Sequence, residues 1–467
     1  MELKESMFRE YDIRGKVSAE ELNDYSVAAI ASAYGVFLKQ RNFNTSVLGY
    51  DNRASSKRFA EIAADSLRKQ GITVYDIGLS VTPMVYYAQY LFHSPGAMMI
   101  TASHNPADWN GMKMAIGYSR TMTPEHMKKM HELAQKVHSP SKNPGKMIQI
   151  DVREDYLNQI VSRFQNLPQH NLRVVVDCAN GAAGVFAYEL FQMLGCKTFQ
   201  LHCDPDDQYP NYFPNPSDSR ARRRMKEMVV HPYIRGDLAM AFDGDGDRLG
   251  VVDSRGRDVW SDRLLIPMAA FVLRKEKGAS IVYDVKCSRA LTESIQTLGG
   301  VGIMAPTGHS HIKEAVRRYE APLGGERSGH IFWSGKYYWG YDDALFAASS
   351  LIALMAKEEA NLDELLNPYP KYEGSPEYHL SCPEQRKYEI VNEVMLLIQK
   401  EFGKEKTITI NGVRLELEDG WGLVRASSNL PELVVVLEGR TKDALNRMET
   451  LFREILAKFA ELGQWQY

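Results

Sequence analysis

Three things are scarce in this sequence: cysteine, long apolar runs, and an excess of charge of either sign. Only five cysteines occur in 467 residues, at irregular spacings and without a CxxC pair. Neither a disulfide framework nor a cysteine-ligated zinc site is therefore predicted, and thiols used in this way are typical of a reducing compartment. We expect a cytoplasmic protein, long enough to bury several cores without covalent cross-links.

The most apolar stretches, residues 264–273 and 344–356, are interrupted by proline or serine. A membrane-spanning helix takes roughly 18–20 apolar residues, so both stretches are too short. The N-terminal sequence MELKESMFREYDIRG has early acidic residues and no apolar core, unlike a secretory signal. No membrane partner is expected.

The charges nearly cancel, with 56 Lys and Arg against 59 Asp and Glu, for a net charge of −3. A general nucleic-acid-binding protein would show a basic domain or stripe, and none is present, so no nucleic-acid partner is expected. We expect small molecules as partners, and a monomer or a small homo-oligomer.

One pattern occurs three times along the chain. An apolar strand ends in an aspartate, at Asp51, Asp177 and Asp284, and is followed by a helix and a second strand. A third element then leads into a polar, Gly-rich or Ser-rich loop. This alternation predicts three similar α/β modules with mixed, mainly parallel sheets. Ligands of such sheets bind beyond the carboxyl ends of the strands, so we expect these loops to line one cleft.

The pattern changes after about residue 370, where a Pro- and Tyr-rich segment leads to a helix, several strand-like segments and a terminal helix from Thr441. That order predicts a small C-terminal α+β domain with an antiparallel sheet. The predicted domain boundaries are 1–150, 151–258, 259–370 and 371–467.

The sequence DGDGDR follows an apolar strand and contains Asp243, Asp245 and Asp247. Glycines let the backbone turn so that alternate carboxylates converge, and a hard divalent cation, Mg²⁺ or Ca²⁺, would relieve their repulsion. An EF-hand is excluded, because Arg248 occupies the glycine position and Ser254 the position of the final glutamate. The alternative is an acidic solvated turn.

Ser103 lies in TASHNP at the end of another apolar strand, with His104 beside it and Lys113 ten residues later. No G-x-S-x-G motif surrounds the serine, so a hydrolase triad is not indicated. On its own the motif fits a helix N-cap or a turn. Its position at a strand end, equivalent to that of the acidic loop, instead favours a serine that accepts and donates a phosphoryl group.

Two further loops carry residues suited to a sugar phosphate. The sequence GGERSGH contains Glu326, Ser328 and His330, which fit sugar hydroxyls, although a Gly-rich connecting turn is the alternative. Lys286 and His309 follow other strands of the same module and are candidates for general acid–base catalysis or phosphate contact, the alternative being ordinary surface residues.

The C-terminal domain contains RASSNLP, in which Arg425, Ser427, Ser428 and Asn429 could form a phosphate-binding concavity, or an ordinary polar turn.

Taken together, these motifs resemble the α-D-phosphohexomutase superfamily, and most closely its phosphomannomutase/phosphoglucomutase branch. The resemblance covers essentially the whole chain and includes YDIRG, TASHNP, VVDCANGAAG, DGDGDR, TGHSHIK, GERSGH and the RAS loop. It implies four domains around one cleft, the first three built alike.

The resemblance also implies roles for individual residues. Ser103 would carry the phosphoryl group, and Asp243, Asp245 and Asp247 with that phosphoserine would bind one Mg²⁺. The groups that assist transfer would be Arg14, His104, Lys113, Arg248, Lys286 and His309. Substrate would contact Tyr11, Lys286, His309, Glu326, Ser328, His330, Arg425, Ser427, Ser428 and Asn429.

The implied reaction is an isomerisation in carbohydrate metabolism, the exchange of hexose 1-phosphate and 6-phosphate of mannose or glucose through a hexose 1,6-bisphosphate. Alternatives are a phosphoglucosamine mutase of the same fold, a metal-dependent phosphohydrolase, and a non-catalytic binding protein. The chain departs from the branch at Arg327, where an apolar residue is common, and in the Ser428–Asn429 pair.

Overall fold

The computed structural model describes residues 3–428 and 430–466. The chain forms two compact units. The first contains residues 1–264 and 328–365, and the second contains residues 265–327 and 366–467.

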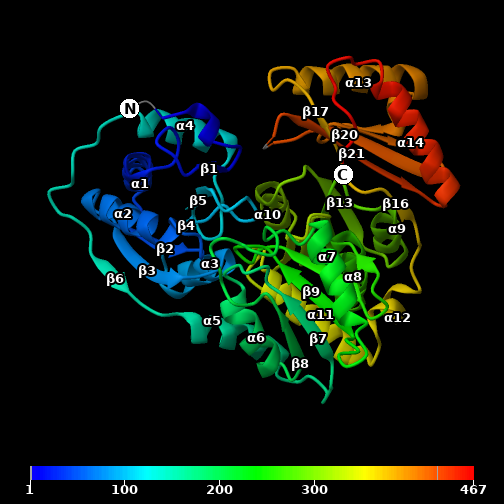
Figure 1. The fold of residues 1–467 in the computed structure, drawn as a ribbon, viewed down its shortest axis with the longest axis horizontal. Coiled ribbons are helices and arrows are strands. Elements are labelled where there is room, and N and C mark those ends of the chain that lie inside the picture. The colour runs from blue at the N-terminus through cyan, green and yellow to red at the C-terminus, as the bar shows by residue number, and fades with distance from the viewer. Residues whose placement is uncertain (1–2, 429, 467) are drawn as a thin grey trace. The chain divides into compact units, whose positions relative to one another are not determined.

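The first α/β module, in the first unit, has a six-stranded sheet in the order β1-β5-β4-β2-β3-β6. Strand β5 runs antiparallel to its neighbours and the other pairs are parallel. Helices α1, α2 and α4 pack over one face, whereas α3 lies against β2 and β4 from the other (Figure 1). Strand β4 is thus covered on both faces, which explains its uninterrupted apolar sequence GAMMI. The elements are β1 (Asp12–Lys16), α1 (Asp24–Lys39), β2 (Thr45–Tyr50), α2 (Ser56–Lys69), β3 (Thr73–Leu79), α3 (Thr82–Leu91), β4 (Gly96–Ile100), β5 (Trp109–Ile116), α4 (Pro124–Ala134) and β6 (Met147–Gln149).

The second module, also in the first unit, has a five-stranded sheet in the order β11-β10-β9-β7-β8. Strand β7 is parallel to β8 and β9, and β10 is antiparallel to β9 and β11. The central strand β9 is buried throughout and ends immediately before the acidic loop. The elements are α5 (Arg153–Val161), β7 (Arg173–Asp177), α6 (Gly184–Met193), β8 (Lys197–Leu201), α7 (Ser219–Val229), β9 (Leu238–Phe242), β10 (Leu249–Asp253) and β11 (Asp258–Val259).

The residues of the third module are divided between the two units. Strand β12 pairs in parallel with β13 and β14 in the second unit. The first unit contains β15 (Ile331–Trp333) and α11 (Ala344–Glu358), and α8 (Ser261–Lys275) crosses from the first unit to the second in its first turn. The remaining elements are β12 (Ser280–Asp284), α9 (Arg289–Thr297), β13 (Val301–Ala305), α10 (His309–Arg318), β14 (Leu323–Gly325) and α12 (Leu362–Leu366).

The C-terminal domain has an antiparallel sheet in the order β16-β21-β20-β19-β18, with β17 also paired to β21. Helices α13 and α14 pack on this sheet (Figure 1). Thr441 is the N-cap of α14, its side chain accepting a hydrogen bond from the Ala444 amide. The elements are β16 (Glu373–Gly374), β17 (Tyr378–Ser381), α13 (Lys387–Phe402), β18 (Thr407–Ile408), β19 (Val413–Glu416), β20 (Gly420–Ala426), β21 (Glu432–Gly439) and α14 (Lys442–Leu456).

A buried arginine of the C-terminal domain joins it to the third module within the second unit. Arg414 on β19 donates hydrogen bonds to the carbonyls of Val285 (2.6 Å) and Cys287 (2.8 Å), just after β12. Its guanidinium carbon lies 3.5 Å from the ring centre of Trp421, which packs with Val285 in an apolar cluster. Both carbonyls are thereby satisfied where water does not reach them.

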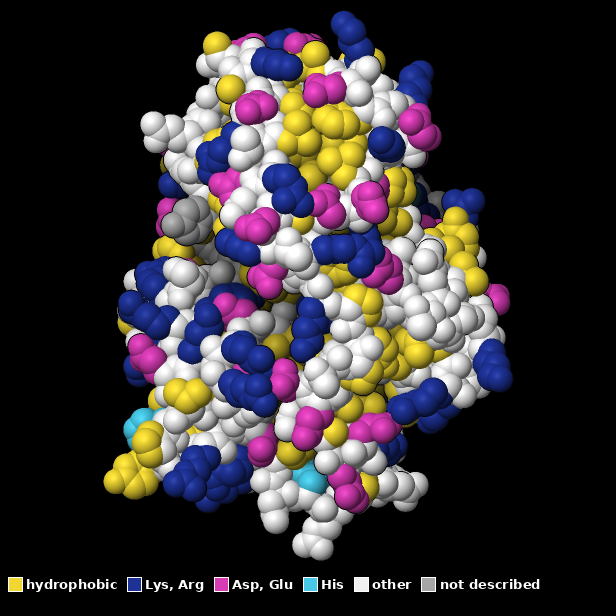
Figure 2. Space-filling view, turned by 90° about the vertical axis from the view of Figure 1, so that its right-hand side faces the viewer, with side chains coloured by type: hydrophobic (Ala, Val, Ile, Leu, Met, Phe, Trp, Pro, Cys, Tyr) yellow, Lys and Arg dark blue, Asp and Glu magenta, His cyan; other side chains and the backbone are white. Residues whose placement is uncertain are grey.

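The predicted fold class is confirmed: three α/β modules with mixed, mostly parallel sheets precede a C-terminal α+β domain. All five cysteines are buried thiols. Within the described part of the chain, no helix combines the length and apolar character needed to cross a bilayer. Figure 2 shows acidic and basic side chains interspersed over one face, in keeping with the small net charge.

Replacing the joining arginine should destabilise the protein. Arg414→Met removes the donors to two buried carbonyls, and we expect a loss of about 2–4 kcal/mol in the free energy of unfolding, measured by urea denaturation. The matched control is Arg447→Met, because Arg447 is 64% exposed and pairs with Asp419 at the surface. It should cost less than about 1 kcal/mol. Equal losses in both variants would contradict the joining role.

Candidate active site

Ser103 lies three residues beyond the end of β4, in a backbone conformation that side-chain-bearing residues seldom adopt. Its φ is +51°, in the left-handed region. The Ser103 amide donates to Thr101 Oγ1 at 2.8 Å, and the residue is buried. A strained, buried serine at the end of a strand is held there by its surroundings, as functional residues often are.

Arg53 provides that support. Its side chain is fully buried, and its terminal nitrogens donate to four backbone carbonyls of the serine loop, the segment from Ser103 to Trp109. Asp51, at the end of β2, pairs with Arg53 Nε at 3.2 Å and supplies the balancing charge. The loop is therefore held by hydrogen bonds along its length. The carbonyls, 2.6–3.0 Å from the guanidinium, belong to Ser103, Asn105, Pro106 and Trp109.

The acidic loop, residues 243–248 between β9 and β10, approaches the serine loop closely. The two glycines of the acidic loop make this approach possible. A Cβ on Gly244 would lie 2.5 Å from the Ser103 carbonyl oxygen, closer than real side chains come to backbone. Gly246 has a φ of +71°, and a Cβ there would lie 2.8 Å from Val81. Two of the predicted strand-end loops are thus brought into contact.

Ser103 Oγ donates a hydrogen bond to Asp243 Oδ2 at 2.8 Å and lies 3.2 Å from His104 Nδ1. Lys113 on β5 places its Nζ 2.6 Å from Asp245 Oδ2 and 2.5 Å from Asp247 Oδ2. The serine hydroxyl, the three carboxylates and one ammonium group therefore form one buried cluster.

Burial is the largest influence on the ionisation of this cluster, and the charges of its members act on one another. Burial and the neighbouring Asp247 and Asp245 carboxylates raise the pKa of Asp243 well above its usual range. Burial alone would lower the pKa of Lys113, but the Asp245 and Asp247 carboxylates outweigh it and raise that pKa. Burial, with the nearby Arg248 and Arg14 charges, keeps the pKa of His104 well below its usual range. His104 is thus neutral at pH 7.

The carboxylates can hold a metal ion. One oxygen from each of Asp243, Asp245 and Asp247 lies within 4.8 Å of the others. Asp245 Oδ1 and Asp247 Oδ1 are buried without a hydrogen-bond donor, which leaves their lone pairs for a cation. An all-oxygen ligand set suits a hard divalent cation. The residues present therefore fit the predicted metal.

Arg248 and Arg14 border the cluster. Arg248 Nε donates to His330 Nε2 at 3.0 Å, and His330 Nδ1 faces Asp342 Oδ2 at 3.0 Å. Arg14 pairs with Asp12 at 2.8 Å on β1, the strand next to the one that carries Lys113.

Tyr11 and Ser328 are half-buried residues of the first unit.

In the second unit, Asp284 organises the loops that carry the candidate sugar contacts. Its carboxylate accepts hydrogen bonds from Thr307 Oγ1 at 2.9 Å and from the Arg327 amide at 3.1 Å. The Glu326 carboxylate accepts a 2.6 Å bond from the Gly308 amide, next to His309. The loops that contain residues 307–309 and 325–327 are thus held together.

The candidate phosphate loop follows β20 in the same unit. Arg425 donates to Asn411 Oδ1 at 2.8 Å and to Ser428 Oγ at 3.3 Å. Ser427 Oγ accepts from the Leu430 amide at 3.2 Å. Asn429, the remaining predicted contact, lies outside the described residues.

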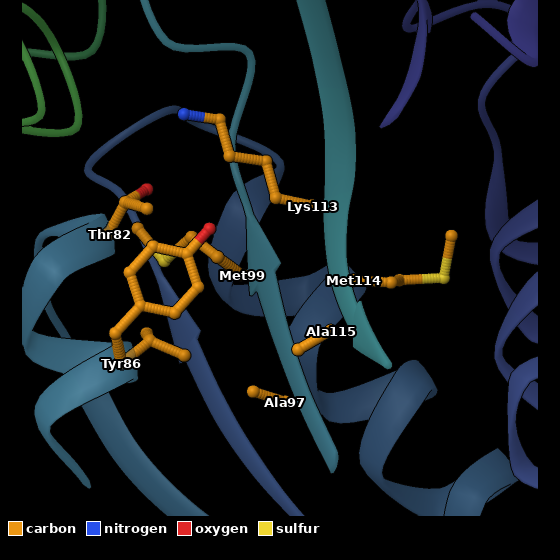
Figure 3. A pocket seen from close by; sticks show the side chains of 8 residues that line it. Thr82, Tyr86, Ala97, Met99, Lys113, Met114 and Ala115 are labelled. Atoms are coloured by element: carbon orange, nitrogen blue, oxygen red, sulfur yellow. The ribbon is translucent and has the colours of Figure 1, made fainter. Parts of the chain in front are cut away.

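A small pocket lies behind Lys113, between β4, β5 and α3, with Thr82 and Tyr86 on its helical side (Figure 3). The pocket is far smaller than the roughly 300–1,000 Å³ of a typical small-molecule site, so it does not fit a sugar phosphate. Thr82 Oγ1 instead donates to Asp245 Oδ2 at 2.5 Å, which fixes one carboxylate of the acidic loop.

Several contributing residues were not found from the sequence. Arg53, Thr82 and Asp342 act through contacts between distant segments, and only Arg53 had a local signal, its place two residues after a strand-end aspartate. Glu377, whose Oε1 accepts a 2.9 Å hydrogen bond from Lys286 Nζ, lies in a connecting segment without a motif.

Family models for phosphoglucomutase/phosphomannomutase match the chain in four consecutive parts. The alpha/beta/alpha domains I, II and III match residues 5–141, 154–256 and 260–372, and the C-terminal domain matches residues 380–455.

Proteins and solved structures similar to the chain agree with these matches. A phosphomannomutase/phosphoglucomutase of Pseudomonas syringae pv. tomato is 37% identical, over 98% of this chain and 96% of its own length. A phosphoglucomutase of Neisseria meningitidis is 34% identical, over 96% of each chain. The crystal structure of a phosphoglucomutase/phosphomannomutase family protein from Burkholderia thailandensis superposes with a TM-score of 0.89, at 31% identity and full coverage of both chains.

Adding a methyl group at Gly244 should separate the two loops of the first unit. In Gly244→Ala the Cβ would clash with the Ser103 carbonyl, and we expect the affinity for Mg²⁺ to fall at least tenfold, measured by calorimetry. Gly278→Ala is the control, because a Cβ there meets nothing within 4 Å, although its φ of +77° adds a backbone cost. Unchanged Mg²⁺ affinity in Gly244→Ala would contradict the close approach.

The Glu377 ion pair predicts a dependence of stability on pH. Burial would raise the pKa of Glu377, but Lys286, through its charge and hydrogen bond, and Arg327 lower it from 4.5 to about 2. A lowered pKa in the folded state adds stability that is complete above pH 4.5 and is lost as the pH falls through 2. At pH 7, Glu377→Gln should therefore be less stable than the natural protein by on the order of 2–3 kcal/mol in urea denaturation. The difference should shrink towards pH 2, and a constant difference would contradict this assignment.

Proposed function

Because the chain belongs to the phosphoglucomutase/phosphomannomutase family, we propose that it is a phosphohexomutase that interconverts hexose 1-phosphate and hexose 6-phosphate of mannose or glucose. One observation carries the proposal: the Ser103 hydroxyl lies 2.8 Å from a buried carboxylate cluster that fits a metal ion and already contains a lysine. That arrangement suits a serine which holds and transfers a phosphoryl group.

In the first half of the reaction, phosphorylated Ser103 gives its phosphoryl group to the sugar's unphosphorylated hydroxyl. The Oγ–P bond breaks, a P–O bond to the sugar forms, and the hydroxyl proton passes to a base. Lys113, Arg248 and Arg14 stabilise the charge that spreads over the phosphoryl oxygens. His104, which is neutral, adds no charge but can donate a hydrogen bond to the same group.

Asp243, Asp245 and Asp247 would hold Mg²⁺, which would neutralise the charge of the serine phosphate and polarise its oxygens. The carboxylates position that charge in a buried setting, where electrostatic interactions are stronger than in water.

Residues of the second unit bind the substrate in this proposal. Glu326 accepts hydrogen bonds from sugar hydroxyls, and Ser328 and His330 are further candidate contacts. His309 is the proton-transfer candidate at the reacting hydroxyl, and Lys286 is a phosphate contact beside it. Arg425, Ser427, Ser428 and Asn429 bind the phosphate that does not react, and Tyr11 contributes a substrate contact.

In the second half, the hexose 1,6-bisphosphate turns over and returns its other phosphoryl group to Ser103. The site must accept the sugar in two opposite orientations. Holding a phosphate at one end and a few hydroxyls at the other permits both, since the two orientations share those groups. A trace of bisphosphate would also restore an enzyme that has lost its phosphoryl group to water.

We propose phosphosugars as the only partners, with no nucleic acid or membrane, and a cytoplasmic monomer or small homo-oligomer. The choice between mannose and glucose, and the related phosphoglucosamine mutase activity, depend on hydroxyl or amino contacts that substrate assays can rank. A phosphohydrolase would differ by passing the phosphoryl group to water.

The first test is turnover of mannose 1-phosphate, glucose 1-phosphate and glucosamine 1-phosphate with Mg²⁺, with and without a trace of hexose 1,6-bisphosphate. We expect 6-phosphates to form with little release of free phosphate, because a sugar hydroxyl is the acceptor. The ranking of sugars identifies the substrate. Phosphate release without isomerisation would instead establish a phosphohydrolase.

Replacing the serine tests the phosphoenzyme. Ser103→Ala should lose at least about 10³-fold in turnover, because it removes the group that carries the phosphoryl. Intact-mass spectrometry should show that the variant also fails to take up a phosphate from the bisphosphate. Ser139→Ala, at an exposed position, is the control for both measurements. Near-normal turnover in a folded Ser103→Ala protein would rule out the serine mechanism.

A further inference from the structure

Glu377 lies in the segment that connects the third module to the C-terminal domain, immediately before β17. Its carboxylate accepts a 2.9 Å hydrogen bond from Lys286 Nζ. The lysine side chain is 6% exposed and that of Glu377 is 24% exposed. The pair therefore sits at an edge that a ligand from solution can reach, with the lysine as its inner member.

Two more cations act on this pair within the second unit. Arg327 lowers the pKa of the Glu377 carboxyl, as Lys286 does more strongly, and its guanidinium donates to the Ser375 carbonyl at 3.0 Å. The charge of Arg425 opposes protonation of Lys286. Lys286 and Arg327 thus act on one partly exposed carboxylate, and Arg425 acts on the lysine of the pair.

The other charged groups near Lys286 and Glu377 already have hydrogen-bond or ion-pair partners. Asp284 accepts hydrogen bonds from Thr307 and from the Arg327 amide. His379 and Glu432 form their own pair at 2.9 Å, and the histidine also lowers the pKa of Glu377. The cations Lys286, Arg327 and Arg425 outnumber the acids Glu377 and Asp284. This excess of positive charge favours an anion.

The backbone on both sides of Glu377 is fixed, so only its side chain is able to move. The Ser375 amide donates to the Leu437 carbonyl at 2.8 Å, and Ser375 Oγ accepts from the Leu437 amide at 2.9 Å. Tyr378 begins β17 and pairs with Val435 of β21. Rotation of the Glu377 side chain would leave these contacts intact.

From these contacts we propose that Glu377 is a displaceable internal counter-ion: a phosphate group of the substrate replaces its carboxylate on Lys286, with Arg327 as a second cation of the same anion site. The proposal rests on the proposed function, because it takes the ligand to be the phosphomonoester of a hexose phosphate. It also assigns a role to Arg327, the residue at which the chain departs from its branch.

A displaceable carboxylate weakens every phosphate bound at Lys286 to the same extent. Such uniform weakening raises KM without slowing the chemical step. Weaker phosphate binding suits an enzyme whose bisphosphate must dissociate from its contacts, turn over and bind again in the opposite orientation. Glu377 therefore keeps the phosphate from being held too tightly for this exchange.

The test is the affinity of the full-length protein for inorganic phosphate, measured by calorimetry and as the inhibition constant against hexose 1-phosphate. Glu377→Gln should bind phosphate about three- to tenfold more tightly, because a like charge has been removed from the site. KM for hexose 1-phosphate should fall in parallel while kcat does not rise. Arg327→Met should weaken phosphate binding by at least about threefold.

The matched control is Glu384→Gln, which removes the same charge from a carboxylate that is 57% exposed and pairs with Lys387. It should leave phosphate affinity unchanged. Unchanged or weaker phosphate binding in folded Glu377→Gln overturns the proposal. If Glu377→Gln does not fold, Glu377→Asp replaces it, and its shorter side chain should also tighten phosphate binding. A natural protein that binds phosphate but does not isomerise hexose phosphates would overturn the proposed function instead, because calorimetry tests the counter-ion without turnover.

Discussion

Mutual repulsion of three carboxylates placed within five residues is the constraint around which the first unit is organised. Asp243, Asp245 and Asp247 are all buried, where a charge without a counter-charge is costly. The first module supplies what the second lacks: Lys113 bridges two of the carboxylates, and Thr82 donates a hydrogen bond to one of them. Side chains of the first module therefore balance the negative charge of the acidic loop in the second module. These contacts join the two modules at the proposed reaction site. A bound cation would add to this arrangement without requiring a new one.

The repeated strand-end aspartate has the same physical task in each module. Asp51 accepts hydrogen bonds from the backbone and side chain of Arg53, Asp177 from the Ala179 amide, and Asp284 from the Arg327 amide. Each buried carboxylate organises the loops beyond the sheet. In each module a buried carboxylate thus accepts hydrogen bonds from the loops beyond the sheet, whereas the functional side chains on those loops differ between modules.

The repeated strand–helix–strand pattern, the acidic loop and the serine loop could be predicted because each is encoded in consecutive residues. Hydrophobic periodicity identified the strands, and glycines between aspartates indicated convergent carboxylates. Arg53 and Glu377 were not identified, because their roles depend on which distant carbonyls and ammonium groups the fold brings near them. Arg327 was noticed as a departure, but its contacts with Asp284 and Ser375 join it to segments 43 residues before it and 48 residues after it in sequence. The limits of the domains remain predictions, as do the roles of the site residues.

In the proposed mechanism, the hydrogen bonds of Arg53 would also restrict how a phosphoryl group on Ser103 is renewed. A protein kinase acts on a segment that extends into its own cleft. The serine loop cannot extend in this way while a buried guanidinium holds four of its carbonyls. A phosphoryl group lost to water would then be replaced by a small phosphorylated molecule that enters the site. On this proposal, keeping the enzyme phosphorylated would depend on its own substrates rather than on a second protein.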